Sequence, residues 1–148
     1  ERTYYSDVDS VTNASANVFA CPTAGQGGMD VSSCLGGSNG FGFGWQDITT
    51  YQFGVAWQQS NDRVVRFGYS RGDQPISSAD ALINILAPGV IEQHVTFGFT
   101  QKRSNGHKVS VALMYAPENS ARGTSLFDPT QGLELSMDQY EIEVSYTF

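Results

Sequence analysis

The sequence predicts an all-β protein of the antiparallel transmembrane β-barrel class. Its last ten residues alternate strictly between apolar and polar, four earlier segments repeat that alternation, and short and long connections take turns between them. Successive side chains of a strand point to opposite faces, so the alternation indicates strands with one apolar and one polar face. The chain has no run of about 18 apolar residues, which a membrane helix requires and a barrel does not.

The last segment, 139–148 (QYEIEVSYTF), shows the pattern most clearly. Its apolar face is aromatic at both ends and aliphatic in the middle, and it consists of Tyr140, Ile142, Val144, Tyr146 and Phe148. Aromatic rings concentrate at the two interfaces of a bilayer, and about ten tilted residues span the roughly 25 Å of a barrel's apolar band. The ending therefore predicts a membrane-spanning strand.

The earlier strands are expected in chain order at about 1–11, 47–58, 63–73, 94–103 and 108–116. Segment 1–11 alternates poorly, and we interpret it as the outer end of a preceding strand. In the other four, large apolar side chains share one face and small or polar side chains share the other. We expect the apolar face to contact lipid. Arg66, His94, Glu141 and Glu143 are expected to face an aqueous lumen, where such charges usually form a solvated or mutually paired network.

Short turns at 59–62 and 104–107 alternate with long connections at about 12–46, 74–93 and 117–138. Bacterial outer-membrane barrels place short turns in the periplasm and long loops outside the cell. Six strands are fewer than the eight with which such barrels begin, and open sheet edges are not tolerated in lipid. The remaining strands are therefore expected from the rest of the protein or from another chain. Glu1 at the start indicates a processed or excised chain.

Composition excludes several function classes. The chain has 8 basic and 15 acidic residues, a net charge of −7, which argues against nucleic acid as a partner. Cys21 and Cys34 flank a turn-rich stretch without histidine, which favours a disulfide in an oxidising compartment over a metal site; two free thiols are the alternative. No metal or other cofactor is expected. The chain is not expected to be an enzyme, because His94 and His107 are its only histidines and no nucleophile-elbow motif is present.

Two groups of apolar residues are candidate ligand contacts in the long connections. Leu82, Ile83, Ile85 and Leu86 are unusually apolar for a solvent-exposed loop. They either meet a hydrophobic ligand at the mouth of the lumen or form a short helix, capped at Ser78, that packs on neighbouring loops. The second group is Phe41, Phe43 and Trp45, which either line the mouth or belong to the aromatic belt.

Several stretches carry a resemblance to a known family. They are SDVDSV at 6–11, GFGWQD at 42–47, GDQP at 72–75, NILAPGVIEQH at 84–94 and the closing Tyr-x-Phe. In this order they resemble the C-terminal third of the outer-membrane long-chain fatty-acid transporters, the FadL type. The resemblance covers nearly the whole chain. It implies that the chain supplies about the last six strands of a fourteen-stranded barrel, whose N-terminal plug precedes this segment.

The resemblance also implies a function and a set of partners. The expected function is passive uptake of long-chain fatty acids or similar hydrophobic molecules across the outer membrane of a Gram-negative bacterium. Alternatives are an aromatic hydrocarbon channel and a structural or adhesion barrel completed by a partner chain. Expected partners are the ligand, outer-membrane lipid with lipopolysaccharide, and the barrel-assembly machinery, which would recognise the closing strand with its terminal Phe148. Relatives often carry a basic residue at the position of Gln46; glutamine offers a carboxylate only a hydrogen bond, which favours a neutral ligand or recognition elsewhere.

Overall fold

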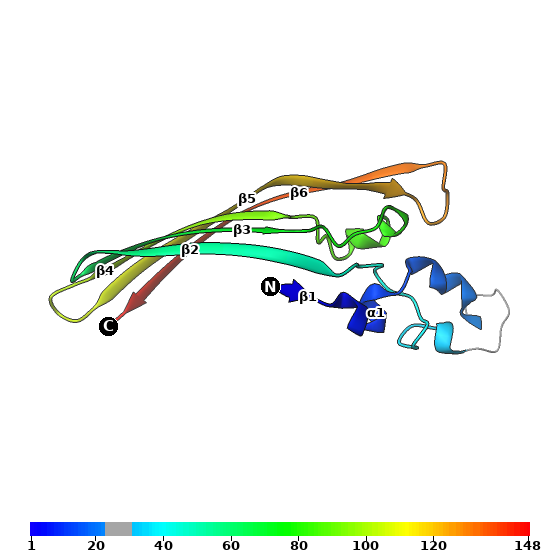
Figure 1. Cartoon of the computed structure of the whole chain (residues 1–148), viewed down its shortest axis with the longest axis horizontal. Coiled ribbons are helices and arrows are strands. Elements are labelled where there is room, and N and C mark those ends of the chain that lie inside the picture. Colours follow the sequence, from blue (N-terminus) through cyan, green and yellow to red (C-terminus); the bar gives the residue numbers. More distant parts are fainter. Residues whose placement is uncertain (23–30) are drawn as a thin grey trace.

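The structure, a computed structural model, describes residues 1–22 and 31–148 and confirms the all-β class. Within these residues, six antiparallel strands form one sheet in the order β1-β2-β3-β4-β5-β6, so each strand pairs with the next along the chain (Figure 1). The strands are β1 (Arg2–Thr3), β2 (Ile48–Ser60), β3 (Arg63–Gly72), β4 (Gln93–Lys102), β5 (Lys108–Thr124) and β6 (Gly132–Thr147). No helix in the described part of the chain is long and apolar enough to span a membrane.

The helices are short and lie in the long connections. They are η1 (Tyr5–Asp7), α1 (Asp9–Thr12), η2 (Ser15–Ala20), η4 (Val31–Ser33), η5 (Ser78–Asp80) and η6 (Ile83–Ile85). Figure 1 shows them gathered at one end of the sheet, whereas the two tight turns and the C-terminus lie at the other. We call these the loop end and the turn end. Part of the predicted first loop, residues 23–30, lies outside the described residues.

The register places the predicted apolar faces of neighbouring strands side by side. One row runs across five strands, from Val55 to Phe67, Phe97, Leu113 and Ile142. Directly opposite side chains lie on the same face of an antiparallel pair, so this row belongs to a continuous apolar surface, here called the outward face. The Phe67 and Phe97 rings meet edge to face with centroids 5.2 Å apart.

The opposite, inward face is made of small and polar side chains. Its neighbouring row runs from Ala56 to Arg66, Gly98, Ala112 and Glu143. In a water-soluble sandwich the outward face would be packed against a second sheet. No second layer covers it within the described residues, and its large side chains are exposed, for example Ile142 at 74% and Val144 at 68%.

The N-terminal strand is much shorter than predicted. Only Arg2 and Thr3 pair with β2, opposite Thr49 and Ile48, and the chain then turns into η1 and α1. The reason is local: this segment lacks an alternating apolar pattern, and a side chain replaces the strand ladder when Ser6 N–H donates to Asp47 Oδ1 at 3.0 Å. The strand expected over residues 1–11 is therefore corrected to Arg2–Thr3.

The loop expected over residues 117–138 is mostly strand. β5 and β6 continue past a bulge between Ala116 and Asn119, and only the connection between Thr124 and Gly132 leaves the ladder. Beyond the bulge the hairpin exchanges the polarity of its faces: the outward side chains are polar or charged, and the inward ones include Leu133, Leu135 and Met137. We call this part, residues 117–138, the upper hairpin.

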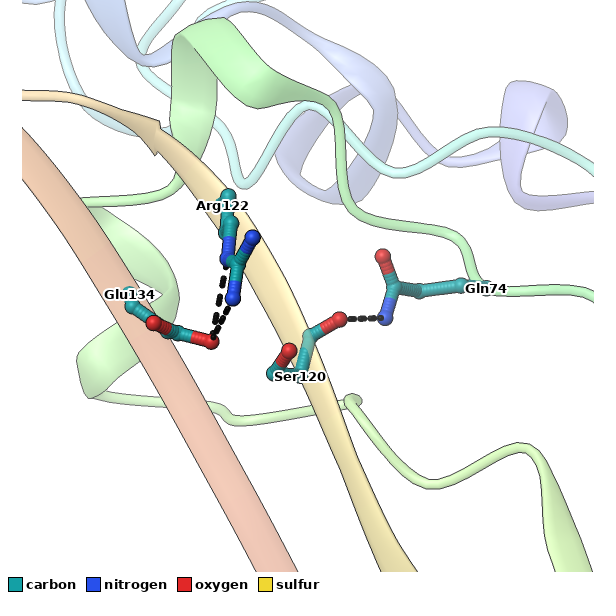
Figure 2. A network of polar contacts seen from close by, with 4 residues as sticks. All are labelled: Gln74, Ser120, Arg122 and Glu134. Carbon is teal, nitrogen blue, oxygen red and sulfur yellow. Dashed lines mark hydrogen bonds and ion pairs between the residues drawn. The ribbon is translucent and has the colours of Figure 1, made fainter.

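Figure 2 shows the two contacts that mark the sides of the upper hairpin. Arg122 pairs with Glu134 across the two strands at 3.0 Å, and both side chains are exposed. Gln74, from the connection after β3, donates to the Ser120 carbonyl at 3.4 Å. The connection between β3 and β4 thus lies against β5, where the six-stranded sheet has narrowed to a hairpin.

The buried core is small and lies at the loop end. Ala81 and Val90 from the β3–β4 connection are fully buried, as is Ala116 of β5. Close packing requires a glycine on β5, because a Cβ at Gly123 would overlap the carbonyl oxygen of Ser78 and the side chain of Ala81. The fold therefore anchors its loops on the upper hairpin and leaves the outward face of the sheet uncovered.

Candidate functional site

Three segments far apart in the sequence meet at the loop end: residues 11–15, 41–46 and 75–91, here called the mouth loops. The backbone N–H groups of Phe43 and Trp45 both donate to the Val11 carbonyl, at 3.2 and 3.1 Å. Gln46 N–H donates to the Pro75 carbonyl at 2.9 Å. Because these bonds join backbone groups, they fix the relative paths of the three segments.

The carboxylate of Asp80 is buried at the centre of the mouth loops. Its Oδ1 accepts from the backbone N–H of Ser15 at 2.8 Å and from the Ser15 hydroxyl at 2.7 Å. Its Oδ2 accepts from the Ser77 hydroxyl at 2.5 Å. A buried carboxylate is costly unless it is hydrogen-bonded, and these three donors satisfy it. Asp80 therefore ties the N-terminal segment to the β3–β4 connection.

Asn84 makes the second link and is fully buried. Its amide N–H₂ donates to the carbonyls of Phe43 and Asp80, both at 2.9 Å, and its Oδ1 accepts from the Trp45 indole N–H at 2.5 Å. All three polar atoms that Asn84 contacts come from the mouth loops. The side chain therefore orients the Trp45 ring as well as the backbone around it.

Gly44 permits the close approach of these segments. Its φ is +67°, a conformation that side-chain-bearing residues rarely adopt, and a Cβ there would overlap the Asp80 carboxylate. The GFG stretch thus has a structural cause, because the backbone must pass directly over a buried acid.

The predicted aromatic contacts lie around this polar centre. Phe43 and Trp45 are half-buried with ring centroids 6.1 Å apart, and the Tyr5 ring meets Trp45 edge to face at 5.0 Å. Phe41 is also half-buried, whereas Gln46 is exposed. The structure thus groups Phe43 and Trp45 in one cluster and leaves Gln46 at the surface.

The apolar loop divides into two pairs. Leu82 and Ile83 are half-buried, whereas Ile85 and Leu86 are exposed at 56% and 76%. Of the two alternatives for this loop, the short helix takes the form of two 3₁₀ turns, η5 and η6. The residue that precedes η5 is Ser77, one residue before the predicted cap at Ser78, and it makes no capping hydrogen bond. Its hydroxyl instead donates to Asp80.

Cys21 and Cys34 form a disulfide. It closes the first long connection close to the upper hairpin, because the Phe19 ring meets the Phe127 ring of the β5–β6 connection edge to face at 6.0 Å. The segment that leads into Cys21 thereby contacts the tip of the upper hairpin.

A cavity of about 280 Å³ lies under the mouth loops on the inward face. Its apolar part is formed by Tyr5, Trp45, Ile48, Pro75 and Ile91. Asp73 and Glu92 also line it, and no lysine or arginine of the described residues does. The cavity therefore combines an apolar part with an acidic border and with the polar side chains Thr50, Gln52, Ser70 and His94.

A second hollow of about 440 Å³ continues along the inward face toward the turn end. Gln52, Ser70 and His94 line both spaces, and the Ser70 hydroxyl lies 3.3 Å from His94 Nδ1. Gly68 forms part of its floor, since a Cβ there would overlap the Thr96 hydroxyl. The two hollows form a continuous polar-floored path that begins beneath the aromatic cluster.

The charged residues predicted to face the lumen lie on the inward face. Arg66 donates to the Thr100 hydroxyl at 2.9 Å and lies in one cross-strand row with Glu143, separated from it by Gly98 and Ala112. Within the described part of the chain, no ion pair joins Arg66 to Glu141 or Glu143. No three metal-ligating side chains lie together among those residues.

Two parts of the site were not predicted. Asp80 and Asn84 are polar residues within an apolar loop, and this contrast is the feature that could have indicated a buried polar centre. The first half of β6 also alternates between apolar and polar residues, with Leu133, Leu135 and Met137 as the apolar ones. Its apolar residues have odd numbers, whereas those of the closing segment 139–148 have even numbers. That phase change could have indicated that the strand continues above the apolar band.

No protein-family model and no curated protein matches the chain. A search of solved structures finds a likeness to the crystal structure of the P. putida toluene transporter TodX, with 25% sequence identity and a TM-score of 0.48. The likeness covers 69% of this chain and 21% of the transporter, so the chain spans about a fifth of that protein's length. A likeness of this degree does not establish a family, and a functional conclusion has to come from the geometry of the chain itself.

Proposed function

We propose that this chain forms part of a bacterial outer-membrane β-barrel that takes up hydrophobic molecules, long-chain fatty acids or molecules like them, without any covalent step. The outward face would contact lipid, the inward face would line the lumen, and the mouth loops would receive the ligand. The observation that carries the proposal is the uncovered apolar face of the sheet, because large exposed apolar surfaces mark contacts with membranes or partners.

The extent of the apolar face matches a bilayer. Its outward side chains run from Tyr140 of β6 to Phe148, the residue after β6, and Tyr140 stacks on Tyr115 of β5 with ring centroids 4.8 Å apart. About nine residues at roughly 3.3 Å each and a tilt of about 40° span roughly 23 Å, close to the apolar band of such barrels. Tyrosines border this band on the loop side, as expected at an interface.

The edges of the sheet require further strands. The β2 edge from Tyr51 onward and the outer edge of β6 carry no partner strand within the described residues. Unpaired backbone groups are not tolerated in hydrocarbon, so a membrane-embedded sheet has to be closed. We propose that other strands, from the rest of the protein or another chain, complete the barrel. The barrel-assembly machinery would insert it, with Tyr140, Ile142, Val144, Tyr146 and Phe148 as the recognised strand.

The ligand would enter at the apolar side chains of the mouth loops. Ile85 and Leu86 would make the first contact, and the aromatic cluster of Phe43 and Trp45 would lead to the cavity on the inward face. Leu82, Ile83, Phe41 and Gln46 stay candidate contacts. A second candidate ligand class, neutral aromatic hydrocarbons, is favoured by the acidic border of Asp73 and Glu92, since two carboxylates disfavour a fatty-acid anion. A structural or adhesion barrel stays the alternative from another class.

The test is uptake by cells. Cells with and without the intact gene would be given labelled oleate or labelled toluene, and uptake should fall in the strain that lacks the gene. The variant Ile85→Ser/Leu86→Ser should lower uptake at least several-fold, because it removes exposed apolar surface from the mouth. The matched control, Arg122→Gln, changes an exposed residue of the upper hairpin and should leave uptake unchanged. Equal uptake in both strains would reject transport and favour an adhesion role.

A further inference from the structure

Two lysines face each other on the inward face of the β4–β5 hairpin. Lys102 of β4 lies directly opposite Lys108 of β5, as the last cross-strand pair before the turn. Both are exposed, and each is two residues from a hydroxyl of the inward face, Thr100 or Ser110. The neighbour of Lys108 on β6 is Thr147, which offers no negative charge. Like charges at directly opposite positions destabilise an antiparallel pair, so an anion on the inward face would relieve a repulsion.

A third cation leans toward this lysine pair. The Arg66 side chain of β3 lies across Gly98, where a Cβ would be 3.4 Å from the Arg66 Cβ. Its guanidinium donates to the Thr100 hydroxyl at 2.9 Å, and that hydroxyl lies 3.0 Å from the Ser110 hydroxyl. Thr100 is one inward row closer to the turn end than Gly98. One arginine and two lysines are thus placed around a pair of hydroxyl groups.

The acidic groups at this end do not pair with the three cations. Lys102 N–H donates to the Asp62 carbonyl at 2.8 Å, but the Asp62 carboxylate forms no ion pair within the described residues. Glu141 and Glu143 lie on the inward face of β6, and in the described part of the chain neither they nor the carboxylate of Phe148 form one. The three positive charges are therefore available to an anion from outside the described residues.

The hollows of the inward face lead to these cations. A third hollow, of about 400 Å³, shares Thr96 and Met114 with the second and extends the path to Arg66. Glu141 and Glu143 line it on the β6 side. An anion in this hollow would be repelled by the two glutamates and attracted by Arg66. The path that begins beneath the mouth loops thus reaches a positive group at the turn end.

We propose that Arg66, Lys102 and Lys108, together with the Thr100 and Ser110 hydroxyls, bind the carboxylate of an amphiphilic ligand; this set is here called the carboxylate site. Arginine and lysine form charge-assisted hydrogen bonds with carboxylates, and hydroxyl groups can donate as well. The inference rests on the proposed function, because the inward face borders a lumen only if the sheet is part of a barrel. It deepens that function, because the site serves a fatty acid and has no use for a neutral hydrocarbon.

The carboxylate site also gives the path a direction. The acids that disfavour an anion, Asp73 and Glu92, line the cavity at the loop end, whereas the cations lie at the turn end. A ligand carboxylate would therefore gain free energy as it moves from the mouth loops toward the turn end. In an outer-membrane barrel the short turns face the periplasm, so this direction is that of uptake.

The test compares two ligands of one chain length that differ in their head group, decanoate and decanol. Their affinities for the intact protein in an uncharged detergent would be measured by calorimetry, with protein-free micelles as the background, at about pH 8, where a carboxyl group is ionised. In Lys102→Gln/Lys108→Gln the affinity for decanoate should fall by about tenfold or more, because a hydrogen bond to a charged group contributes about that factor. The affinity for decanol should stay unchanged.

Two further variants separate the carboxylate site from net charge and from folding. Arg63→Gln/Arg71→Gln removes two charges from the outward face of β3, and decanoate affinity should change by less than about twofold because exposed charges on the other face are screened. Lys102→Arg/Lys108→Arg should keep the wild-type affinity. Lys102→Gln/Lys108→Gln removes a like-charge pair and should fold at least as stably as the wild type, which its unchanged decanol binding would verify.

The outcomes are distinguishable from a failure of the proposed function. If the wild type bound neither ligand, the uptake proposal and the carboxylate site would both be rejected. Binding of decanol without decanoate would overturn only the carboxylate site, and the cations would then have to pair with acidic side chains of other strands. Decanoate affinity that persists in Lys102→Gln/Lys108→Gln, or that falls equally in Arg63→Gln/Arg71→Gln, would overturn it as well.

Discussion

The β5–β6 hairpin has opposite surfaces on the two sides of its bulge. From Tyr140 to Tyr146 the outward side chains of β6 are apolar and exposed, whereas from Glu134 to Asp138 they are polar or charged. The inward face changes in the other sense, from Glu141 and Glu143 to apolar residues of the upper hairpin. The apolar side chains of a regular strand lie on the face that is shielded from water. They can change to the other face along one strand only if the surroundings of the strand change.

The comparison locates the proposed bilayer boundary between Asp138 and Tyr140. Below that level the sheet needs no covering layer, because hydrocarbon would cover it. Above it the hairpin behaves as part of a water-soluble protein, with an exposed ion pair outside and the mouth loops packed inside. The loop end therefore uses ordinary core packing, whereas the strands below would have the membrane as their second layer under the proposed function.

The strongest test of this comparison is one arginine placed on either side of the boundary. Val144→Arg lies in the middle of the apolar band and should destabilise the inserted protein by about 2–4 kcal/mol. Ser136→Arg, on the same face of the same strand, should change stability by less than about 1 kcal/mol, because that position faces water. The measurement is urea unfolding of the intact protein in vesicles. Equal effects of the two arginines would contradict the assigned boundary.

The second prediction concerns the disulfide, which belongs to the water-exposed region alone. Cys21→Ser/Cys34→Ser opens a loop of 13 residues in sequence separation. In the chain-entropy model this costs about 3 kcal/mol, and the cost should be confined to the loop end. Protease cleavage between residues 11 and 46 should accelerate while the strands stay protected.

Reduction of the wild-type disulfide is the control for that variant and should give the same cleavage pattern. Unchanged cleavage in both would show that the Phe19–Phe127 contact holds the loop without the covalent link.

The third prediction tests how rigidly the mouth loops are joined. Asn84→Leu leaves the Trp45 indole N–H and two carbonyls without their partner, which should cost about 1–3 kcal/mol for the buried groups. Local loosening should be visible as a red shift of Trp45 emission in a Trp57→Phe background. Asn61→Leu, in an exposed turn, is the matched control and should shift neither the emission nor the stability. A loop end that tolerates Asn84→Leu would be held by its backbone bonds and the Asp80 carboxylate without the Asn84 side chain.

Sequence reasoning predicted the sheet well because alternation and turn chemistry are local properties. The apolar face of each strand from β2 to β6 could be predicted from residues such as Phe67 and Leu113, since the side-chain period of a strand is fixed. The upper hairpin was not predicted because its alternation has the opposite phase. We assumed that the same face of the strand is apolar along its whole length, and Leu133 and Leu135 were therefore assigned to a loop.

The mouth loops could not be predicted to the same degree. Asp80 contacts Ser15, 65 residues away, and Asn84 contacts Trp45, 39 residues away. No periodic pattern connects such positions, because each contact depends on how three irregular segments fold against one another. The apolar residues of the loop were identified, but their division into packed and exposed pairs follows from tertiary structure.

The smallest expected effect tests whether the N-terminal segment lies in water above the boundary. The Ser6 backbone N–H donates to Asp47 and lowers the pKa of that carboxyl below its usual value, with a smaller contribution from the positive charge of Arg2. A depressed pKa means that the bond stabilises the folded segment above the unfolded pKa of about 4 and that this contribution is lost as the pH falls through the lower folded value. Amide hydrogen exchange of Tyr5–Asp7, corrected for intrinsic rates, should therefore show protection at pH 6 that fades below about pH 4.

Asp47→Asn is the control, because its amide oxygen can still accept from Ser6 but does not titrate in this range. The variant should show weaker protection with no pH dependence between pH 6 and pH 3, conditions chosen to bracket the carboxyl pKa of about 4. If wild-type protection were unchanged at pH 3, the carboxylate would not be what turns the chain away from β2 after Thr3. The short β1 would then have to be explained by the weak alternation of residues 1–11 alone, without a contribution from the charge of Asp47.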